Sequence, residues 1–205
     1  MAENASDLGG QAEAFREVLF PLCTRTLAAG LFPDPAAPGG WFAFSRIAAI
    51  PRSVEREFLL PAGGLSERDL RPFLFPEGAP LAFDPVRGMI RGFVDLLFRQ
   101  GEKTYLLDYK TNRLPGESEA EAYGPDGLSR AMAQHRYDFQ GLLYSLALHR
   151  LLAFSRPDYD YDRHFGGALF LFVRGAGERG EGVVHLRPDR AEIESLSALF
   201  SGEGR

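Results

Sequence analysis

Two aspartates and a lysine lie on either side of one expected turn of the chain. Asp95 belongs to the segment G-F-V-D-L-L-F-R and Asp108 to T-Y-L-L-D-Y-K, with the pair Gly101-Glu102 between them. A glycine-containing pair between two apolar runs predicts a β-hairpin. In that hairpin Asp95 faces Asp108 across neighbouring strands, and Lys110 follows two residues later.

Carboxylates placed in this way need a positive charge beside them. Directly opposed residues have Cβ atoms roughly 4.5–5.5 Å apart, and like charges at that spacing are destabilising. Side chains alternate along a strand, so Lys110 shares a face with Asp108 while Tyr109 points away. The flanking residues are apolar on both faces, and we therefore expect a sheet that is covered on both sides. Carboxylates in such a setting become protonated, pair with a cation or bind a metal. Their oxygen atoms are ligands that suit Mg²⁺, Mn²⁺ or Ca²⁺. The alternative is a structural ion cluster in which Lys110 pairs with both aspartates.

The surrounding patterns predict helices packed on a mixed β-sheet, an α/β fold. The Gly/Pro-rich stretch from Leu65 to Pro85 is expected to be irregular, and Leu114 to Gly127 to form a mobile loop near the acids. The first expected helix runs from Gln11 to about Leu31, with Phe15, Val18, Leu19, Leu22 and Leu27 on its apolar side. Before the hairpin, S-V-E-R-E-F-L-L-P is expected to be extended, and after it one long helix is expected from Leu128 to Phe154. The strands F-G-G-A-L-F-L-F-V-R and G-V-V-H-L follow, and a last helix, capped by Asp189, runs through Phe200.

Composition bounds the class of protein. The 205 residues, with 45% hydrophobic and 12% aromatic content, predict one domain with a substantial core. A formal net charge of −5 argues against a protein that coats DNA nonspecifically, but not against a nuclease whose metal brings its own positive charge. The single cysteine, Cys23, is expected to be a buried apolar residue in a reducing compartment. The acidic N-terminus is unlike a secretory signal. No stretch reaches the ~18 consecutive apolar residues of a membrane span. A cytoplasmic protein is therefore expected.

The expected long helix adds polar groups at helical spacing. Gln140 and Tyr144 are four residues apart, so their side chains lie on one face of the helix. Over the hairpin they would reach a phosphate or the neighbourhood of a metal, although such a pair by itself is more often just a partly exposed helix face. Upstream of the hairpin, Glu55 and Glu57 alternate with Val54, Arg56 and Phe58 and are expected on one face of a strand.

Together these segments resemble a known family. G-F-V-D, L-L-D-Y-K-T-N and Q-G-L-L-Y fit the pattern D…(D/E)-x-K…Q-x-x-x-Y of RecB-type nucleases, in the restriction-endonuclease-like PD-(D/E)XK superfamily. The longer segments V-R-G-M-I-R-G-F-V-D-L-L-F-R, A-Q-H-R-Y-D-F-Q and D-Y-D-Y-D-R-H-F-G-G-A-L-F-L-F-V-R-G resemble the C-terminal nuclease domain of the RecB family. The resemblance runs from about Val54 to Pro188.

The resemblance implies a restriction-endonuclease-like mixed sheet flanked by helices and a Mg²⁺-dependent DNA nuclease, at whose site Mn²⁺ or Ca²⁺ can also bind. It implies DNA, RecC- and RecD-like subunits and an N-terminal helicase region as partners in double-strand break repair and recombination, with no membrane association. The resemblance assigns Asp95, Asp108, the Tyr109 carbonyl and Glu55 as metal ligands, and Glu57 is the alternative to Glu55. It assigns Lys110, Asp108, Gln140 and Tyr144 to catalysis.

One departure from the family pattern concerns histidine. The family has a metal-binding histidine upstream of the first acid, whereas His135, His149, His164 and His185 all follow Asp95. The chain is therefore expected to be a single nuclease domain, residues 1–205, that lacks the start of the domain and the helicase portion. An alternative function is a truncated, noncatalytic module that docks DNA or partner subunits. An iron–sulfur nuclease is disfavoured, because Cys23 is the only cysteine.

Overall fold

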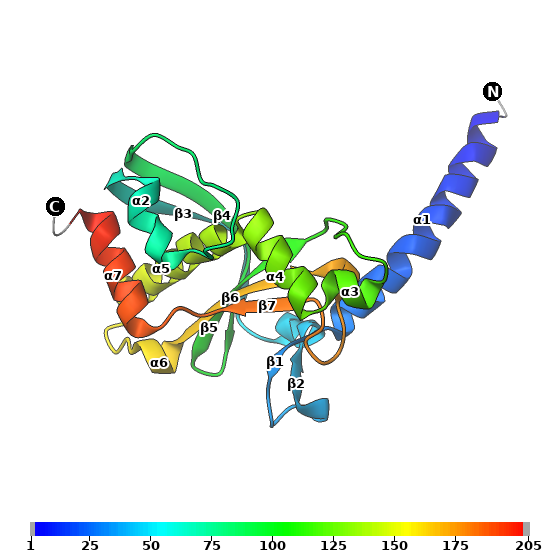
Figure 1. Ribbon diagram of the computed structural model, residues 1–205. Coiled ribbons are helices and arrows are strands. Elements are labelled where there is room, and N and C mark those ends of the chain that lie inside the picture. Colours follow the sequence, from blue (N-terminus) through cyan, green and yellow to red (C-terminus); the bar gives the residue numbers. More distant parts are fainter. Residues whose placement is uncertain (1–2, 203–205) are drawn as a thin grey trace.

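The computed structural model describes residues 3–202, without the side chains of residues 3–12, 14 and 15. A five-stranded sheet in the order β3-β4-β5-β6-β7 lies among helices (Figure 1). Strands β5 and β6 run parallel, and the other neighbouring pairs run antiparallel. The expected fold class, a mixed sheet flanked by helices, is confirmed.

The expected helices and strands follow one another in the expected order, and short elements that were not expected lie between them, including a helix at Glu67–Leu70 in the stretch expected to be irregular. The strands are β1 (Gly30–Pro33), β2 (Trp41–Ala43), β3 (Arg52–Leu65), β4 (Val86–Gln100), β5 (Lys103–Lys110), β6 (Phe165–Phe172) and β7 (Val183–Leu186). The α-helices are α1 (Glu3–Ala28), α2 (Glu67–Leu70), α3 (Glu119–Tyr123), α4 (Pro125–Gln134), α5 (Tyr137–Ser155), α6 (Tyr161–His164) and α7 (Arg190–Ser201). Short 3₁₀ turns are at Pro38–Gly40, Phe44–Ala49, Arg71–Phe73 and Val173–Gly175.

The central hairpin has the expected register up to its last pair. The strands β4 and β5 meet at the Gly101-Glu102 turn, where Gly101 has a φ of 59°, and Leu96 faces Leu107 at the far end of the ladder. The ladder stops there, so the backbones at Asp95 and Asp108 do not pair as the sequence predicted. The two strands separate where the acids lie, which leaves backbone groups at that point for side chains to bind.

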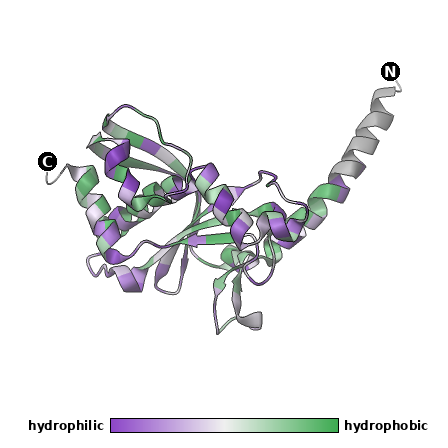
Figure 2. Ribbon diagram, viewed as in Figure 1, coloured by the Kyte–Doolittle hydropathy of each residue, from purple (hydrophilic) through white to green (hydrophobic). Residues whose placement is uncertain are grey.

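Both faces of the inner strands β5 and β6 are covered. On one face Leu106 and Phe170 belong to a core cluster with residues of α4, α5 and α7. On the other face Leu107 and Leu169 belong to a second cluster with residues of the small β1–β2 sheet. Apolar colouring accordingly dominates these central strands (Figure 2). This part of the sheet is covered on both sides, as expected.

The ribbon formed by the distal parts of β3 and β4 departs from this expectation. Its inner face carries Phe58, Leu60 and Val94, which pack into the first cluster. Its outer face, which is solvent-exposed, carries Glu57, Leu59, Pro61, Met89, Arg91 and Phe93. These six residues are cross-strand partners, because Glu57 pairs with Phe93, Leu59 with Arg91 and Pro61 with Met89. The prediction of cover on both sides is wrong here, since the two-stranded ribbon extends beyond the strands that carry the second cluster.

Helix α1 differs from its prediction in both position and cover. It ends at Ala28, and Leu31 is a buried residue of β1 instead. The helix projects away from the rest of the molecule (Figure 1). Val18 and Leu27 are therefore 65% and 52% exposed, and Cys23 is exposed where burial was expected. The side chain of Phe15 lies outside the described residues.

The expected long helix is two helices. The chain breaks between α4 and α5 at Arg136, which has a left-handed backbone with a φ of 53° and a ψ of 36°. The Arg136 guanidinium lies 3.1 Å from buried Asp138 and donates to the Phe75 carbonyl, which fixes the segment before β4 against this junction. The expected loop after β5 also contains a short helix, α3, whose N-cap is Ser118.

The last helix is confirmed. Asp189 and Glu192 form a reciprocal capping box at the start of α7, which ends at a left-handed Gly202. Among residues 3–202, no helix is long and apolar enough to cross a membrane.

Candidate active site

A buried ion pair lies at the end of β5. Asp108 and Lys110 are 6% and 7% exposed, and the Lys110 ammonium is 2.6 Å from Oδ2 of Asp108. Both side chains point toward α5, while Tyr109 belongs to the cluster on the opposite face, as strand alternation predicts. Burial of two charges is unfavourable unless the pair is well formed and further hydrogen bonds complete it.

Helix α5 supplies those hydrogen bonds. Gln140 accepts from Lys110 Nζ at 2.7 Å through its Oε1, and its Nε2 donates to the Tyr144 hydroxyl at 2.6 Å and faces Asp108 Oδ1 at 3.3 Å. The Tyr144 hydroxyl is 2.7 Å from Asp108 Oδ1 and 3.0 Å from the Phe93 carbonyl oxygen. Its single hydrogen can be donated to one of these two acceptors at a time. One turn of helix thus brings both predicted residues onto the acid, as their four-residue spacing indicated.

Asp95 is attached to the same group of residues through the backbone. Its Oδ2 accepts a hydrogen bond from the Tyr109 N–H at 2.9 Å. This N–H is available because the β4–β5 ladder has already ended. Asp95 therefore lies beside the residue that follows Asp108, although the two acids are not ladder partners. Its Oδ1 accepts no hydrogen bond from any residue that the structure describes.

The two candidate glutamates are not equivalent. Val54 pairs with Leu96 and Arg56 with Val94, which places Glu55 opposite Asp95 in the β3–β4 register. Glu55 has a φ of 50°, a conformation that is uncommon for a residue with a side chain and that occurs often at functional sites. Glu57 instead lies on the outer face of the ribbon, 2.5 Å from Arg91.

Glu55 and Glu57 are both exposed, and the expectation that they share one strand face fails at Glu55, because its left-handed backbone interrupts the alternation. Within residues 3–202 no group of three or more His, Cys, Asp or Glu side chains lies close enough together to hold a metal ion, so Glu55, Asp95 and Asp108 do not form such a group.

The histidines lie in contacts of their own. His149 bonds the Tyr159 hydroxyl, His164 the Asp160 N–H, and His185 the Gly166 carbonyl, whereas His135 stacks on Tyr137. The contacts of His135 and His149 are those of ordinary satisfied or solvated side chains. His164 is fully buried, and its Nε2 has no hydrogen-bond partner among the described residues.

Aromatic rings surround the charged groups. The Lys110 ammonium is 3.8 Å from the centre of the Tyr137 ring and 5.2 Å from that of Phe170, a favourable arrangement for a cation. Sequence analysis missed Tyr137, although it precedes Gln140 by three residues and Tyr144 by seven, which is the spacing of one helix face. The carbonyl of Phe93 was also missed, because the sequence carries no signal for which backbone groups side chains will bind.

Electrostatics keeps the phenols of the site neutral. Burial, together with the negative charge of Asp108, raises the pKa of Tyr144 far above its ordinary value of 10.0. Burial and Asp108 also raise the pKa of Tyr137, and burial with Asp95 raises that of Tyr109. Tyr144 is therefore a hydrogen-bond donor throughout the physiological pH range.

The oxygen atoms gathered here are chemically suited to a hard divalent cation. Asp95 has an oxygen without a hydrogen bond from any described residue, and Asp108 retains lone pairs beyond its three contacts. Carboxylate and backbone carbonyl oxygens are the ligands that Mg²⁺ and Ca²⁺ prefer. The donor set fits such an ion.

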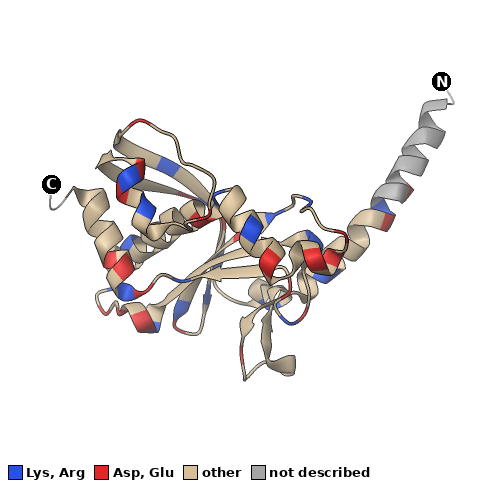
Figure 3. Ribbon diagram, in the orientation of Figure 1, with Lys and Arg blue, Asp and Glu red and all other residues tan. Residues whose placement is uncertain are grey.

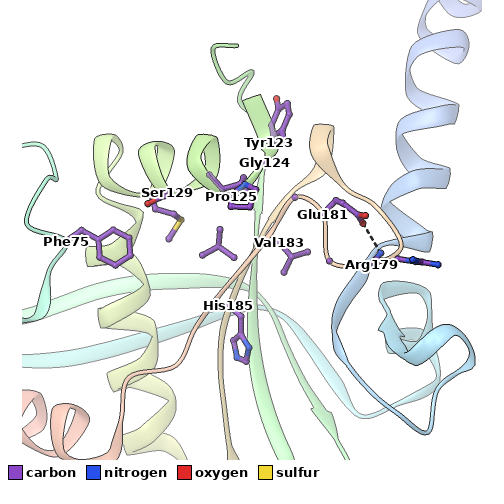
Figure 4. A pocket seen from close by; sticks show the side chains of 14 residues that line it. Phe75, Tyr123, Gly124, Pro125, Ser129, Arg179, Glu181, Val183 and His185 are labelled. Atoms are coloured by element: carbon purple, nitrogen blue, oxygen red, sulfur yellow. Dashed lines mark hydrogen bonds between the residues drawn. The ribbon is translucent and has the colours of Figure 1, made fainter. Parts of the chain in front are cut away.

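A separate cavity of about 500 Å³ lies between α4 and β7 (Figure 4). Phe75, Ser129, Val183 and His185 line it. No candidate site residue borders this cavity, so its walls contribute nothing to the acidic group at the end of β5.

Comparison with known proteins shows the family to which the chain belongs. The model of the PD-(D/E)XK nuclease superfamily matches residues 10–203, and the chain belongs to that superfamily. The chain is 39% identical over 96% of its length to the RecBCD enzyme subunit RecB of Escherichia coli (strain K12), of which it covers 17%. It is 46% identical over 58% of its length to RecB of Haemophilus influenzae, covering 10%, and 35% identical over 88% to RecB of Mycolicibacterium smegmatis, covering 20%. The chain thus spans a small part of these relatives and is similar to their nuclease domain.

Proposed function

We propose that this chain is a Mg²⁺-dependent nuclease domain that hydrolyses phosphodiester bonds in DNA. The observation that carries the proposal is the convergence of Asp108, Lys110, Gln140 and Tyr144 beside Asp95, at the point where β4 and β5 separate. A buried acid and a buried lysine in contact are costly to fold unless further hydrogen bonds complete the pair, as Gln140 and Tyr144 do here. Membership of the superfamily supports the same chemistry.

Asp95, Asp108 and the carbonyl of Tyr109 would hold the cation, and Glu55 is the candidate for a further ligand from β3. Glu55 is preferred to Glu57 because it stands opposite Asp95 in the strand register. When bound, the cation would supply positive charge that stabilises the charge developing on the phosphate.

Lys110 would act on the reacting phosphate or on the attacking water. Gln140 and the Tyr137 ring hold its ammonium at a fixed position, so little reorganisation is needed during the reaction. Tyr144 and Gln140 are positioning residues, because they orient the Asp108 carboxylate by donating to its Oδ1. Asp108 in turn contacts the Lys110 ammonium at 2.6 Å.

We further propose that the domain works within a RecBCD-type helicase–nuclease during double-strand break repair and recombination. The proposed partners are DNA, RecC- and RecD-like subunits and a helicase region. The names of the relatives and the small share of their length that the chain covers support this assignment.

A cleavage assay on linear DNA, combined with calorimetric titration of Mg²⁺, tests the proposal. Wild-type protein should degrade DNA with Mg²⁺ and stop when EDTA is added. Asp108→Asn and Lys110→Met should each reduce the rate by at least about a hundredfold, as expected when a group that stabilises the transition state is lost. Asp126→Asn, an exposed acid on α4, is the matched control and should cleave normally.

A noncatalytic module that docks DNA or partner subunits is the second candidate function. The observation in its favour is that all the histidines make contacts away from the acids. Wild-type protein that gives neither heat with Mg²⁺ nor cleavage products would establish docking and end the nuclease proposal.

A further inference from the structure

The outer face of the β3–β4 ribbon combines exposed apolar side chains with arginine. Leu59, Met89 and Phe93 are 56%, 57% and 53% exposed, and Arg91 lies among them. Contiguous exposed apolar side chains on a folded protein mark an interaction surface. Phe93 is the aromatic member of this group, and it lies two residues before Asp95.

The aromatic ring of Phe93 is already contacted by a cation on one side. The Arg91 guanidinium lies 5.1 Å from the ring centre, and Glu57 holds that guanidinium at 2.5 Å. The arginine is thereby oriented against the ring instead of moving freely in solvent. An aromatic ring beside an arginine is the combination on which proteins stack nucleic-acid bases.

Phe93 is also connected to the proposed active site through its backbone. Its carbonyl oxygen is 3.0 Å from the Tyr144 hydroxyl, the same hydroxyl that lies 2.7 Å from Asp108. Along a strand, two residues span roughly 7 Å, so the backbones of Phe93 and Asp95 are separated by about the length of one nucleotide. The residue that carries the exposed ring is therefore held in place by the group that orients the acid.

The charge of the ribbon suits a nucleic-acid strand. On the outer face Arg87 and Arg91 are exposed, and Glu57 is the exposed acid beside them. Lys and Arg colouring is visible along the ribbon (Figure 3). Arginines along the path of a strand neutralise its phosphates.

We infer that Phe93 is a stacking platform for a nucleobase, which positions an unpaired DNA strand beside Asp95 with Arg91 as its supporting cation. This inference rests on the proposed nuclease function and adds a residue that selects the form of the substrate. A stacked ring requires an unstacked base, so the platform favours single-stranded over duplex DNA.

Binding of a fluorescently labelled oligodeoxythymidylate, followed by anisotropy in EDTA so that no cleavage occurs, tests the inference. Phe93→Leu keeps apolar bulk but removes the ring, and it should weaken binding about tenfold. Phe93→Trp should bind as tightly as wild type or more tightly. A duplex of the same length should lose less than about twofold in Phe93→Leu, because its bases already stack on one another.

Leu59→Ala and Met89→Ala are the matched controls, since both residues are as exposed as Phe93 and lie on the same face. They should leave single-strand binding unchanged. The inference is overturned if they weaken binding as much as Phe93→Leu does, or if Phe93→Leu binds like wild type. If Phe93→Leu binds DNA normally but loses association with a partner subunit, the face is a protein-docking surface instead.

Cleavage by the wild type distinguishes failure of the inference from failure of the function. If the wild type shows normal Mg²⁺-dependent cleavage and Phe93→Leu binds DNA as the wild type does, the stacking role of Phe93 is rejected and the nuclease function is retained. A wild-type protein that neither binds nor cleaves DNA would reject both.

Discussion

Asp108 and Lys110 lie 2.6 Å apart with less than a tenth of either side chain exposed. Removing one member of such a pair leaves a buried charge without its partner, so Asp108→Ala or Lys110→Ala should lower the free energy of unfolding by about 3–5 kcal/mol. The double variant Asp108→Asn with Lys110→Met, which has no charge left to compensate, should recover most of that loss. Urea unfolding measures all these variants. Single variants as stable as the wild type would show that water already reaches the pair.

Tyr144 should prove to be a positioning residue. Tyr144→Phe loses only the hydroxyl that contacts Asp108 and the Phe93 carbonyl, so the fold should persist with a loss of about 1–2 kcal/mol. The turnover number should fall, because the acid is no longer fixed, while the KM for DNA should change little. Tyr123→Phe is the control, since its hydroxyl also makes buried hydrogen bonds, to Leu114 and Asn112, away from the acids. Equal kinetic effects of both substitutions would reduce Tyr144 to a structural role.

Stability should decrease in alkaline solution. Burial raises the pKa of Tyr144, first through desolvation and then through Asp108, so the folded state keeps its proton at pH values where the unfolded phenol, with an ordinary pKa of 10.0, loses it. The stabilisation is complete below pH 10 and declines as the pH rises above that value, because the unfolded state then binds fewer protons. Tyr105, Tyr109 and Tyr137 have raised pKa values for the same primary reason and add to the slope.

Urea unfolding at a series of pH values, compared between wild type and Tyr144→Phe, isolates the contribution of Tyr144 to this decline. The variant should lose stability less steeply above pH 10. Identical slopes would mean that Tyr144 ionises as easily in the folded protein as in the unfolded chain.

The left-handed backbone at Arg136 should respond to glycine. Arg136→Ala and Arg136→Gly both remove the ion pair with Asp138, but only glycine adopts a φ of 53° without steric cost. Arg136→Gly should therefore be about 1–2 kcal/mol more stable than Arg136→Ala in denaturant unfolding. The reverse order would place the strain elsewhere in the α4–α5 junction.

Glu55 and Glu57 should differ in their effect on metal dependence. Glu55→Gln should raise the Mg²⁺ concentration that gives half-maximal cleavage by about 10-fold or more, because Glu55 is the candidate for a further ligand and loss even of a residue that supports metal ligands has an effect of that size. Glu57→Gln should leave that concentration unchanged, because its carboxylate is paired with Arg91 on the outer face. The opposite result would exchange their roles.

The hairpin register and the Gln140–Tyr144 contacts could be predicted because short-range rules determine them. A two-residue turn fixes which residues face each other, and a four-residue spacing fixes a helix face. The break at Arg136 could not be predicted, since two consecutive helices can carry the same apolar pattern along the sequence as one. The exposure of Cys23 could not be predicted either, because an amphipathic pattern does not show whether another element covers the apolar side of the helix. The backbone of Glu55 has no sequence signal at all.

The contacts of Asp108 join three separate elements. Its own strand is β5, its hydrogen-bond donors Gln140 and Tyr144 belong to α5, and the Tyr144 hydroxyl also meets the Phe93 carbonyl of β4. A slight loosening of α5 from the sheet would thus separate the acid from both donors while the strands stayed paired. On gentle heating, cleavage should accordingly be lost before the main unfolding transition. Catalysis is then the most sensitive measure of how tightly α5 packs on the sheet.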